Sequence, residues 1–549
     1  MEVATTVTIR YKATPHFPQR EGKRGGIERA SCVGALFFSP PSKARKLEKM
    51  HQVWRILLTF AAMFKSYTDM KRLLFFVLWL SVAATQAQTA RKFTLNLTPD
   101  GKAHMVCYLP ENPSGRAIVG VPGGGYSMLS NTHEGYEAAE WMNRRGISYF
   151  VVNYRLPEGD RSLPMGDVQK AMRTVRDSAS LWGIHPRNVG IMGFSAGGHL
   201  ASVISTHSEF DVRPDFSILF YPVISMDERV THKYSCRNFL GREGQQNKEL
   251  VRQFSTQNAV RRHLTPPALI ITANDDRLVP FVTNGLEYYR AMRSAGNECT
   301  MHVYPSGDHG FGFGKWFRHH QQLMADLGAW LDHLPMPAED AIRVACIGNS
   351  ITDGHGIDMA TSHGYPALLQ QRLGEKYWVK NFGVSARTLL NKGDHPYMNE
   401  LAWRDAVAFN PDIVIITLGT NDSKPGNWQH GAEFRQDLVQ MITTLCPELA
   451  DLPKNKKKRA KALAGVKKQI YLCTPIPAFK QTWAINDSVI THGIIPVQQD
   501  VAREYGLRVI DLHTLFAGDG DKMLSDGIHP NGDGARRMAE IIAEALGKE

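Results

Sequence analysis

The sequence predicts two consecutive α/β domains, each built on a mostly parallel sheet with helices on both faces. Apolar strand-like runs alternate with amphipathic helical stretches from residue 117 onward, which is the pattern of such sheets. A short segment with two prolines at residues 335–340 interrupts the alternation, and the pattern starts again at residue 342. The two halves hold roughly 250 and 210 residues, so each is large enough to bury a core of its own.

The first domain is expected over residues 88–334. Within it, residues 167–182 are expected to form a helix, because their apolar positions recur at helical spacing: Val168, Met172, Val175, Ala179 and Trp182. Six strands are expected, at residues 117–121 (AIVGV), 148–154 (SYFVVNY), 188–192 (NVGIM), 216–220 (FSILF), 268–272 (ALIIT) and 300–304 (TMHVY).

The second domain is expected over residues 341–549, after a linker at residues 335–340. Its strands are expected at residues 342–348 (IRVACIG), 377–383 (YWVKNFG), 412–419 (DIVIITLG), 469–475 (QIYLCTP) and 507–512 (LRVIDL). A closing helix would present one apolar face, formed by Met538, Ile541, Ile542 and Ala545. The halves share no repeat, so the chain is not a duplication.

The first 87 residues contain an export pattern. Residues 70–87 (MKRLLFFVLWLSVAATQA) begin with two basic residues, continue with an apolar run and end in small residues, as a signal peptide cleaved after Ala87 would. The apolar run is too short to favour a stable membrane span. We therefore expect translation from Met70, a disordered and wrongly assigned leader at residues 1–69, and a secreted or periplasmic bacterial protein.

The positive charge of the chain is concentrated in a few segments. The whole sequence has 64 Lys and Arg against 53 Asp and Glu, a net charge of +11. Residues 1–69 contribute +7 and residues 70–87 contribute +2, so only +2 remains for the exported chain. Within that chain, residues 451–468 carry +7, which is typical of a solvated loop or helix face. No nucleic-acid partner is therefore expected.

Ser195 stands in a sequence that suits a nucleophile. The run GIMGFSAGGHLAS at residues 190–202 places it between a strand and a helix, with small neighbours that permit a tight turn. Such a turn presents the hydroxyl at the carboxyl edge of the sheet. Upstream, VPGGGYS at residues 121–127 offers the amides of Gly124 and Gly125 to a developing oxyanion, and the amide of Ala196 would be a further donor.

The partners of this serine are expected downstream. The run ITANDDRLVP at residues 271–280 leaves a strand with two acids, Asp275 and Asp276, and His309 follows the last strand in a glycine-rich loop. Serine, acid and histidine in this order are typical of one class of hydrolase triad. His199 and Asp308 are also near these motifs, but a helix-surface position and a turn position are the favoured interpretations.

These motifs resemble the α/β-hydrolase superfamily, and most closely its secreted carbohydrate esterases of the acetyl-xylan and feruloyl type, over about residues 95–334. The resemblance implies Ser195 as nucleophile, His309 as base and Asp276 as orienting acid. Asp276 is preferred to Asp275 because it stands four residues before the proline of the family's D-x-x-V-P pattern. The family's H-G-G-G loop has Pro122 in place of its histidine, a departure that concerns the oxyanion pocket.

Four short blocks at strand ends carry the chemistry of the second half. ACIGNSITDGHG at residues 345–356 holds Ser350, and NFGVSART (381–388) and LGTNDSKP (418–425) are glycine-containing turns. LSDGIHPNGDG at residues 524–534 places Asp526 three residues before His529. One such block would be a weak signal, but four blocks in order form a strong one.

The four blocks resemble the SGNH, or GDSL-type, hydrolases, which have a flavodoxin-like sheet, over about residues 341–549. The resemblance implies Ser350 as nucleophile, His529 as base and Asp526 as its partner. Oxyanion donors would be the amides of Ser350 and Gly383 and the side-chain amide of Asn421, because an N–H group can donate to a developing oxyanion. The first block reads G-N-S-I instead of G-D-S-L, a change outside the nucleophile.

His355, His513 and Trp428 have no assigned role in this pattern. Trp428 could stack on a sugar ring, although a packed aromatic residue is the favoured interpretation. The sequence contains no zinc-peptidase, Walker or dinucleotide-binding motif, so neither a metal nor a cofactor is expected.

We therefore expect a secreted serine esterase with two independent sites, each acting through an acyl-enzyme. The expected substrate is an acetylated plant cell-wall polysaccharide or oligosaccharide such as xylan, and feruloyl release by the first half stays open. Two alternatives also stay open. The second half resembles sialate O-acetylesterases, which would act on host glycans, and one half could be an inactive esterase that only binds glycan. A prolyl-oligopeptidase-like peptidase is disfavoured because no propeller domain accompanies the first half.

Overall fold

The computed structural model describes residues 91–547, which form part of one compact unit. The expected leader at residues 1–69 and the expected signal peptide at residues 70–87 lie outside the described residues. Within residues 91–547, no helix is both long and apolar enough to cross a membrane.

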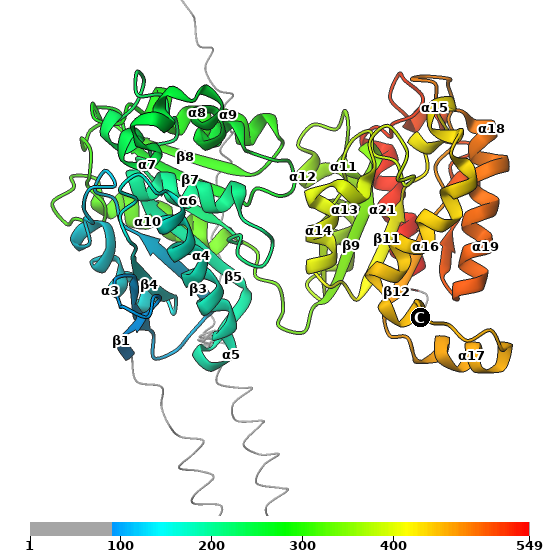
Figure 1. Ribbon diagram of the computed structural model, residues 1–549, viewed down its shortest axis with the longest axis horizontal. Coiled ribbons are helices and arrows are strands. Elements are labelled where there is room, and N and C mark those ends of the chain that lie inside the picture. The colour runs from blue at the N-terminus through cyan, green and yellow to red at the C-terminus, as the bar shows by residue number, and fades with distance from the viewer. Residues whose placement is uncertain (1–90, 548–549) are drawn as a thin grey trace, which may run out of the picture. The chain divides into compact units, whose positions relative to one another are not determined.

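The first sheet has eight strands in the order β1-β2-β4-β3-β5-β6-β7-β8 (Figure 1). Strands β3 to β8 run parallel, and β2 pairs antiparallel with both β1 and β4. The strand bounds are β1 Arg91–Asn96, β2 His104–Leu109, β3 Gly115–Val121, β4 Ser148–Asn153, β5 Ile184–Phe194, β6 Ser217–Phe220, β7 Ala268–Ala273 and β8 Cys299–Tyr304.

Helices cover both faces of this sheet. Side chains of α4, α6 and α9 pack in one apolar cluster, and side chains of α3 and α10 pack in another, so a helix layer lies on each side. The helix bounds are α3 Ala138–Arg144, α4 Ser162–Asp177, α5 Ala179–Trp182, α6 Ala196–His207, α7 Lys233–Gln246, α8 Lys248–Phe254, α9 Gly285–Ser294 and α10 His320–His333. This order of strands and helices is that of the predicted α/β-hydrolase fold.

The second sheet has five parallel strands in the order β10-β9-β11-β12-β13. This is the flavodoxin-like order, in which the first strand lies between the second and the third. The strand bounds are β9 Ile342–Gly348, β10 Tyr377–Asn381, β11 Ile413–Thr417, β12 Gln469–Cys473 and β13 Arg508–Ile510. The predicted flavodoxin-like sheet is therefore present.

Helices also cover both faces of the second sheet. Helices α13 and α21 lie on one face and helices α16 and α19 on the other (Figure 1), and the buried side chains of the two pairs belong to separate apolar clusters. The helix bounds are α11 Ser350–Asp353, α12 Ala360–His363, α13 Tyr365–Leu373, α14 Leu401–Ala408, α15 Pro425–Trp428, α16 Phe434–Leu445, α17 Lys456–Gly465, α18 Asp487–Val489, α19 Ile495–Tyr505, α20 Leu512–Leu515 and α21 Gly532–Gly547.

Two local features differ from the sequence prediction. Strands β1 and β2 form an antiparallel hairpin that was not predicted, because β1 exposes its polar residues and has only two apolar ones; β2 (HMVCYL) is itself an apolar run. The helix expected over residues 167–182 is divided into α4 and α5 at Ser178, whose backbone leaves the helical region (φ −94°, ψ 6°). All five residues of its predicted apolar face are nevertheless buried.

The basic segment at residues 451–468 forms the short helix α17 in its middle. None of the side chains of α17 is buried, as expected for a solvated face. Asn455 caps the helix by accepting hydrogen bonds from the amides of Lys457 and Lys458.

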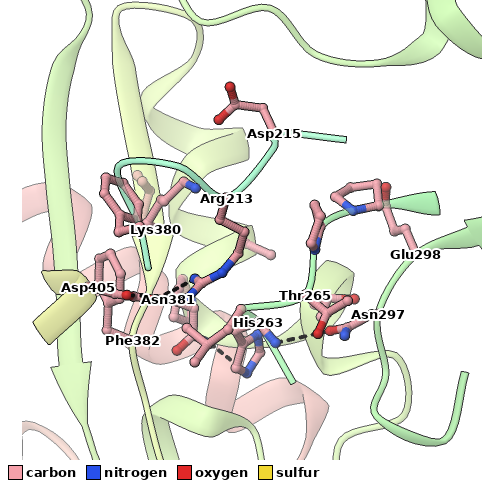
Figure 2. A pocket seen from close by; sticks show the side chains of 18 of the residues that line it. Arg213, Asp215, His263, Thr265, Asn297, Glu298, Lys380, Asn381, Phe382 and Asp405 are labelled. Atoms are coloured by element: carbon pink, nitrogen blue, oxygen red, sulfur yellow. Dashed lines mark hydrogen bonds and ion pairs between the residues drawn. The ribbon is translucent and has the colours of Figure 1, made fainter. Parts of the chain in front are cut away.

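A buried ion pair links residues that are far apart in the chain. Arg213 and Asp405 are 2.5 Å apart, with side chains only 7% and 1% exposed. Both lie at the edge of a cavity of about 290 Å³ that His263, Lys380 and Asn381 also line (Figure 2). Burial lowers the pKa of Lys380 to about 8. None of the predicted catalytic residues lines this cavity.

Candidate active sites

Ser195 lies at the turn between β5 and α6, near the middle of the first sheet. Its backbone is in a strained conformation (φ +54°, ψ −118°), as a nucleophile at a sharp strand-to-helix turn requires. The glycines around it are needed for space: a Cβ at Gly193 would come within 2.2 Å of the Gly197 carbonyl oxygen, and one at Gly197 within 2.2 Å of the Val121 carbonyl oxygen. The local sequence therefore dictates this turn.

The structure brings Ser195, His309 and Asp276 together in a hydrogen-bonded chain. Nε2 of His309 lies 2.7 Å from Oγ of Ser195, and Nδ1 of His309 lies 2.7 Å from Oδ2 of Asp276. The Asp276 side chain is fully buried and the His309 side chain is 13% exposed. With Nδ1–H donating to the carboxylate, Nε2 is free to accept the serine proton.

The two neighbouring acids have different positions. Asp276 contacts the His309 ring and also accepts hydrogen bonds from the amides of Leu278 and Val279. Asp275 instead accepts hydrogen bonds from the backbone amides of Gly307 and Asp308, and so holds the loop that carries the histidine. The side chain favoured by the sequence is thus the one that the structure places against the imidazole.

The glycine-rich loop after β3 lies against the nucleophile. A Cβ at Gly123 would come within 3.0 Å of Ser195 Cβ, which shows how closely the loop approaches. The amide of Gly123 donates to Oε2 of Glu134. Among residues 91–547, no protein acceptor faces the amides of Gly124, Gly125 or Ala196, so these predicted donors are available to an oxyanion.

Glu134 and Tyr221 are two buried residues that sequence reasoning missed. The Tyr221 hydroxyl donates to Oε1 of Glu134 and accepts from the amide of Gly312, and its ring centre is 4.7 Å from that of His309. Burial raises the pKa of Glu134, although its hydrogen bond from Tyr221 and the nearby His309 oppose this. The pair therefore connects the oxyanion loop to the histidine loop. No sequence motif marks either residue.

The prediction of a surface position for His199 is wrong, because the side chain is completely buried. Its Nε2 donates to the Phe254 carbonyl at 2.9 Å, and its Nδ1 accepts from the Tyr126 hydroxyl at 2.8 Å. Burial lowers the pKa of His199 to about 4, so the ring is a neutral structural element. Asp308 has a positive φ of +53° in its loop, which agrees with the turn position expected for it.

Ser350 lies at the start of α11, two residues after the end of β9, which lies between β10 and β11. This is the point where the strand order reverses, at which ligands bind in flavodoxin-like sheets. Nε2 of His529 lies 2.7 Å from Oγ of Ser350, and Nδ1 of His529 lies 3.0 Å from Oδ2 of Asp526. The second predicted set of residues therefore also forms a hydrogen-bonded chain.

The environment of the second chain favours a neutral imidazole. Burial lowers the pKa of His529, and the charge of His355 acts in the same direction, while Asp526 opposes the shift. Burial would raise the pKa of Asp526, but hydrogen bonds from the amides of His529 and Ile528 hold it below its usual range. Asp526 is thus a carboxylate that can orient a neutral base.

The predicted oxyanion donors of the second site differ in whether their N–H groups are free to bind a ligand. The amide of Gly383 donates to Oδ1 of Asn381 at 2.8 Å, so it is already engaged, which corrects its expected role as a free donor. Asn421 uses one N–H of its side chain, to the Arg387 carbonyl at 3.2 Å, and keeps a second one. Among residues 91–547, no protein acceptor faces the amide of Ser350.

Two aromatic side chains that the sequence did not assign surround His529. The ring centres of His355 and Trp483 lie 4.4 Å and 5.3 Å from that of His529. Trp428, which the sequence singled out, instead packs against Phe434 with ring centres 5.8 Å apart. The favoured interpretation of Trp428 as a packed aromatic is confirmed.

Comparison with known proteins identifies the same two halves. The α/β hydrolase fold family matches residues 118–313, and the GDSL-like lipase/acylhydrolase family matches residues 346–537. The chain is 70% identical to the acetylxylan esterase of Xylanibacter ruminicola over 479 residues, which cover 87% of this chain and 100% of that protein.

Two further proteins match part of the chain. The chain is 34% identical to endo-1,4-beta-xylanase B of Butyrivibrio fibrisolvens over 205 residues, 35% of this chain and 31% of that protein. A solved structure of an acetyl ester-xyloside bifunctional hydrolase from Caldicellulosiruptor lactoaceticus is 29% identical, with a TM-score of 0.41, and covers 45% of this chain and 97% of its own. The two family matches, over residues 118–313 and 346–537, confirm the predicted fold classes and their order.

Proposed function

The chain is a serine carboxylic-ester hydrolase that belongs to the acetylxylan esterase family, and we propose that it removes acetyl groups from xylan at two independent active sites. The observation that carries this proposal is the presence of two Ser–His–Asp chains, each with a histidine Nε2 2.7 Å from a serine Oγ. The name of the 70% identical relative supports the substrate class.

At the first site, Ser195 would attack the acetyl carbonyl carbon while His309 takes the serine proton. The tetrahedral oxyanion would be stabilised by the amides of Gly124 and Ala196, which have no other acceptor among residues 91–547. His309 then returns the proton to the departing sugar oxygen. Water, activated by the same imidazole, hydrolyses the acetyl-enzyme and releases acetate.

At the second site, the same steps would use Ser350 as nucleophile and His529 as base. Here the oxyanion would be bound by the Ser350 amide and by the free N–H of Asn421, whose side chain is held by the Arg387 carbonyl. The low pKa of His529 keeps the imidazole in the neutral form that accepts a proton.

Three variants test this proposal: Ser195→Ala, Ser350→Ala and the double variant. We expect each single variant to keep part of the activity on p-nitrophenyl acetate and on acetylated xylan, and the double variant to lose at least about 10⁴-fold. Complete loss in either single variant contradicts two independent sites, and activity in the double variant contradicts both nucleophile assignments. Release of acetate from O-acetylated sialic acid in preference to acetylated xylan would favour the sialate esterase instead.

We also propose that the protein is exported by a signal peptide at residues 70–87. The support is the order of basic, apolar and small residues in that segment. N-terminal sequencing of the protein from the culture medium and the periplasm should give a chain that begins at Gln88. A chain that retains residues 70–87 contradicts cleavage at this position.

A second acyl group is proposed for the first site only. Met128 and Leu278 are 59% and 48% exposed, and they adjoin the oxyanion loop and the triad acid respectively. Such apolar side chains can bury the ring of a feruloyl group, whereas an acetyl group is too small to use them. We expect Ser350→Ala to hydrolyse methyl ferulate and Ser195→Ala to be inactive on it, and the opposite pattern would overturn the assignment.

A further inference from the structure

Trp483 is an exposed tryptophan next to the catalytic histidine of the second site. It is 54% exposed, and its ring centre lies 5.3 Å from that of His529 and 6.3 Å from that of His355. Both contacts are edge-to-face, with interplanar angles of 63° and 90°. Among residues 91–547 no aromatic ring is stacked on the indole, and more than half of the residue is exposed to solvent.

The backbone that presents this indole is strained. Trp483 and Ala484 both have positive φ angles, +51° and +59°, which are rare for a bulky residue and cost about 1–3 kcal/mol each. A solvent-exposed tryptophan gains little from burial to offset such strain. Strain of this kind is retained where the surroundings impose it, and it is concentrated at functional sites.

The segment around Trp483 is tied to the loop that carries the catalytic acid and base. The Thr482 hydroxyl donates to the Asp526 carbonyl at 2.7 Å, and the amide of Phe479 donates to the Gly527 carbonyl at 2.9 Å. The Lys480 ammonium donates to the Ser525 carbonyl at 2.9 Å. The position of the indole is therefore fixed relative to His529.

A shallow hollow adjoins the same segment. It has a volume of about 490 Å³, and the residues that line it include Asp394, Lys424, Asn427 and Ala484. Asn427 donates to the carbonyl of the oxyanion residue Asn421 at 2.8 Å, so the hollow lies beside the reacting centre. The Lys424 ammonium and the Asp394 carboxylate pair with each other at 3.3 Å but remain 20% and 41% exposed, so these two groups can also bind sugar hydroxyls, whereas the buried Asn427 amide is already engaged by Asp394 and Asn421.

We propose that Trp483 is the platform on which a sugar ring of the polysaccharide chain stacks at the second active site, with the adjoining hollow binding the hydroxyls of a neighbouring sugar. A flat apolar ring face next to converging polar groups is the chemistry that binds a pyranose, whose ring has an apolar face and a polar rim. This inference rests on the proposed function of the second site and names its specificity-determining residue.

The test uses the Ser195→Ala chain, in which only the second site can act, with acetylated xylo-oligosaccharides and p-nitrophenyl acetate as substrates. We expect Trp483→Ala to lower the ratio of kcat/KM for the oligosaccharide to that for p-nitrophenyl acetate about 10-fold, mainly by raising KM. Trp483→Phe, which keeps an aromatic face, should restore most of this ratio. The matched control is Trp316→Ala in the first domain, a residue that is 65% exposed and should leave the ratio unchanged.

If Trp483→Ala leaves the ratio of the two kcat/KM values unchanged, Trp483 is not a platform for a sugar ring. This holds when both activities persist and also when both fall equally, and an equal fall would mean that Trp483 only supports His529. Failure of the Ser195→Ala chain to deacetylate any xylo-oligosaccharide would refute the proposed function of this site. In that case, calorimetric titration of the Ser195→Ala/Ser350→Ala chain with deacetylated xylohexaose decides the platform separately. Binding that weakens about 10-fold in Trp483→Ala supports it, and equal binding overturns it.

Discussion

In the first active site the acid and the base lie in different loops, 33 residues apart, whereas in the second they are separated by three residues within one turn. The serines differ too: Ser195 has a strained backbone with φ +54°, while Ser350 begins a helix that the Asn349 side chain caps. Both arrangements give a serine Oγ to histidine Nε2 distance of 2.7 Å. The comparison shows that the triad chemistry constrains the final geometry of three side chains and leaves the chain path free.

The surroundings of the two sites also differ. The acid of the first site, Asp276, is fully buried, whereas the side chain of Asp526 is 15% exposed. Exposed Met128 and Leu278 adjoin the first site, and Trp483 adjoins the second. The difference in burial should make the first site depend more on its acid, and the difference in exposed side chains should give the two sites different substrate preferences.

The largest expected effect comes from neutralising the acid of each site. In the Ser350→Ala chain, Asp276→Asn should lower kcat on p-nitrophenyl acetate about 10⁴-fold, because an asparagine N–H faces Nδ1 and imposes the wrong tautomer on His309. In the Ser195→Ala chain, Asp526→Asn should have an effect about tenfold smaller, because a partly solvated carboxylate interacts less strongly with the imidazolium.

The matched control for this comparison is Asp275→Asn, since the asparagine carbonyl can still accept from the amides of Gly307 and Asp308. We expect it to reduce the activity of the first site by no more than about threefold. If Asp275→Asn is as damaging as Asp276→Asn, the assignment of Asp276 as the acid of the first site is wrong. If Asp526→Asn is more damaging than Asp276→Asn, the ranking of the two acids by burial is wrong.

An intermediate effect is expected for Glu134→Ala, which removes the acceptor for the Gly123 amide and for the Tyr221 hydroxyl. Two buried donors would then lack a partner, at a cost of about 1–3 kcal/mol, and the oxyanion loop would lose its support. In the Ser350→Ala chain, kcat on p-nitrophenyl acetate should fall about 10–100-fold. The second site, measured in the Ser195→Ala chain, serves as an internal control for folding and should keep its activity.

The smallest expected effect is on the pH profile of the second site. An imidazole acts as a base only when neutral, and burial holds the pKa of His529 below its usual range. The acid limb of kcat/KM in the Ser195→Ala chain should therefore have its midpoint below about pH 6.5. His355→Gln removes a nearby positive charge, so the pKa of His529 should rise and the midpoint should move to higher pH. A midpoint that moves to lower pH contradicts this interaction.

The sequence predicted most of what is local in this protein. The parallel strands were predicted because buried strands of α/β sheets are continuous apolar runs, and Ser195 because a strand-to-helix turn needs small residues around it. Ser350 was predicted from four motif blocks that follow one another in order. Asp526 and His529 were predicted together because they occupy one turn. The β1–β2 hairpin was missed although β2 is an apolar run, since β1 has only two apolar residues among exposed polar ones.

The contacts between distant segments required the tertiary structure. Only the fold shows that Asp276 contacts the histidine while Asp275 holds its loop, and that Asn381 already engages the Gly383 amide. Sequence reasoning also placed a completely buried histidine on a helix surface and considered Trp428 where Trp483 lies beside the site.

By itself, then, the sequence determined the two domains, their order and the residue types of two serine triads, because these depend on periodicity and on motifs of a few residues. The tertiary structure alone decided which predicted oxyanion donors are free and which aromatic residue lies at the second site. Those choices depend on distances of about 3 Å between loops that are tens of residues apart, and no local pattern encodes such a distance.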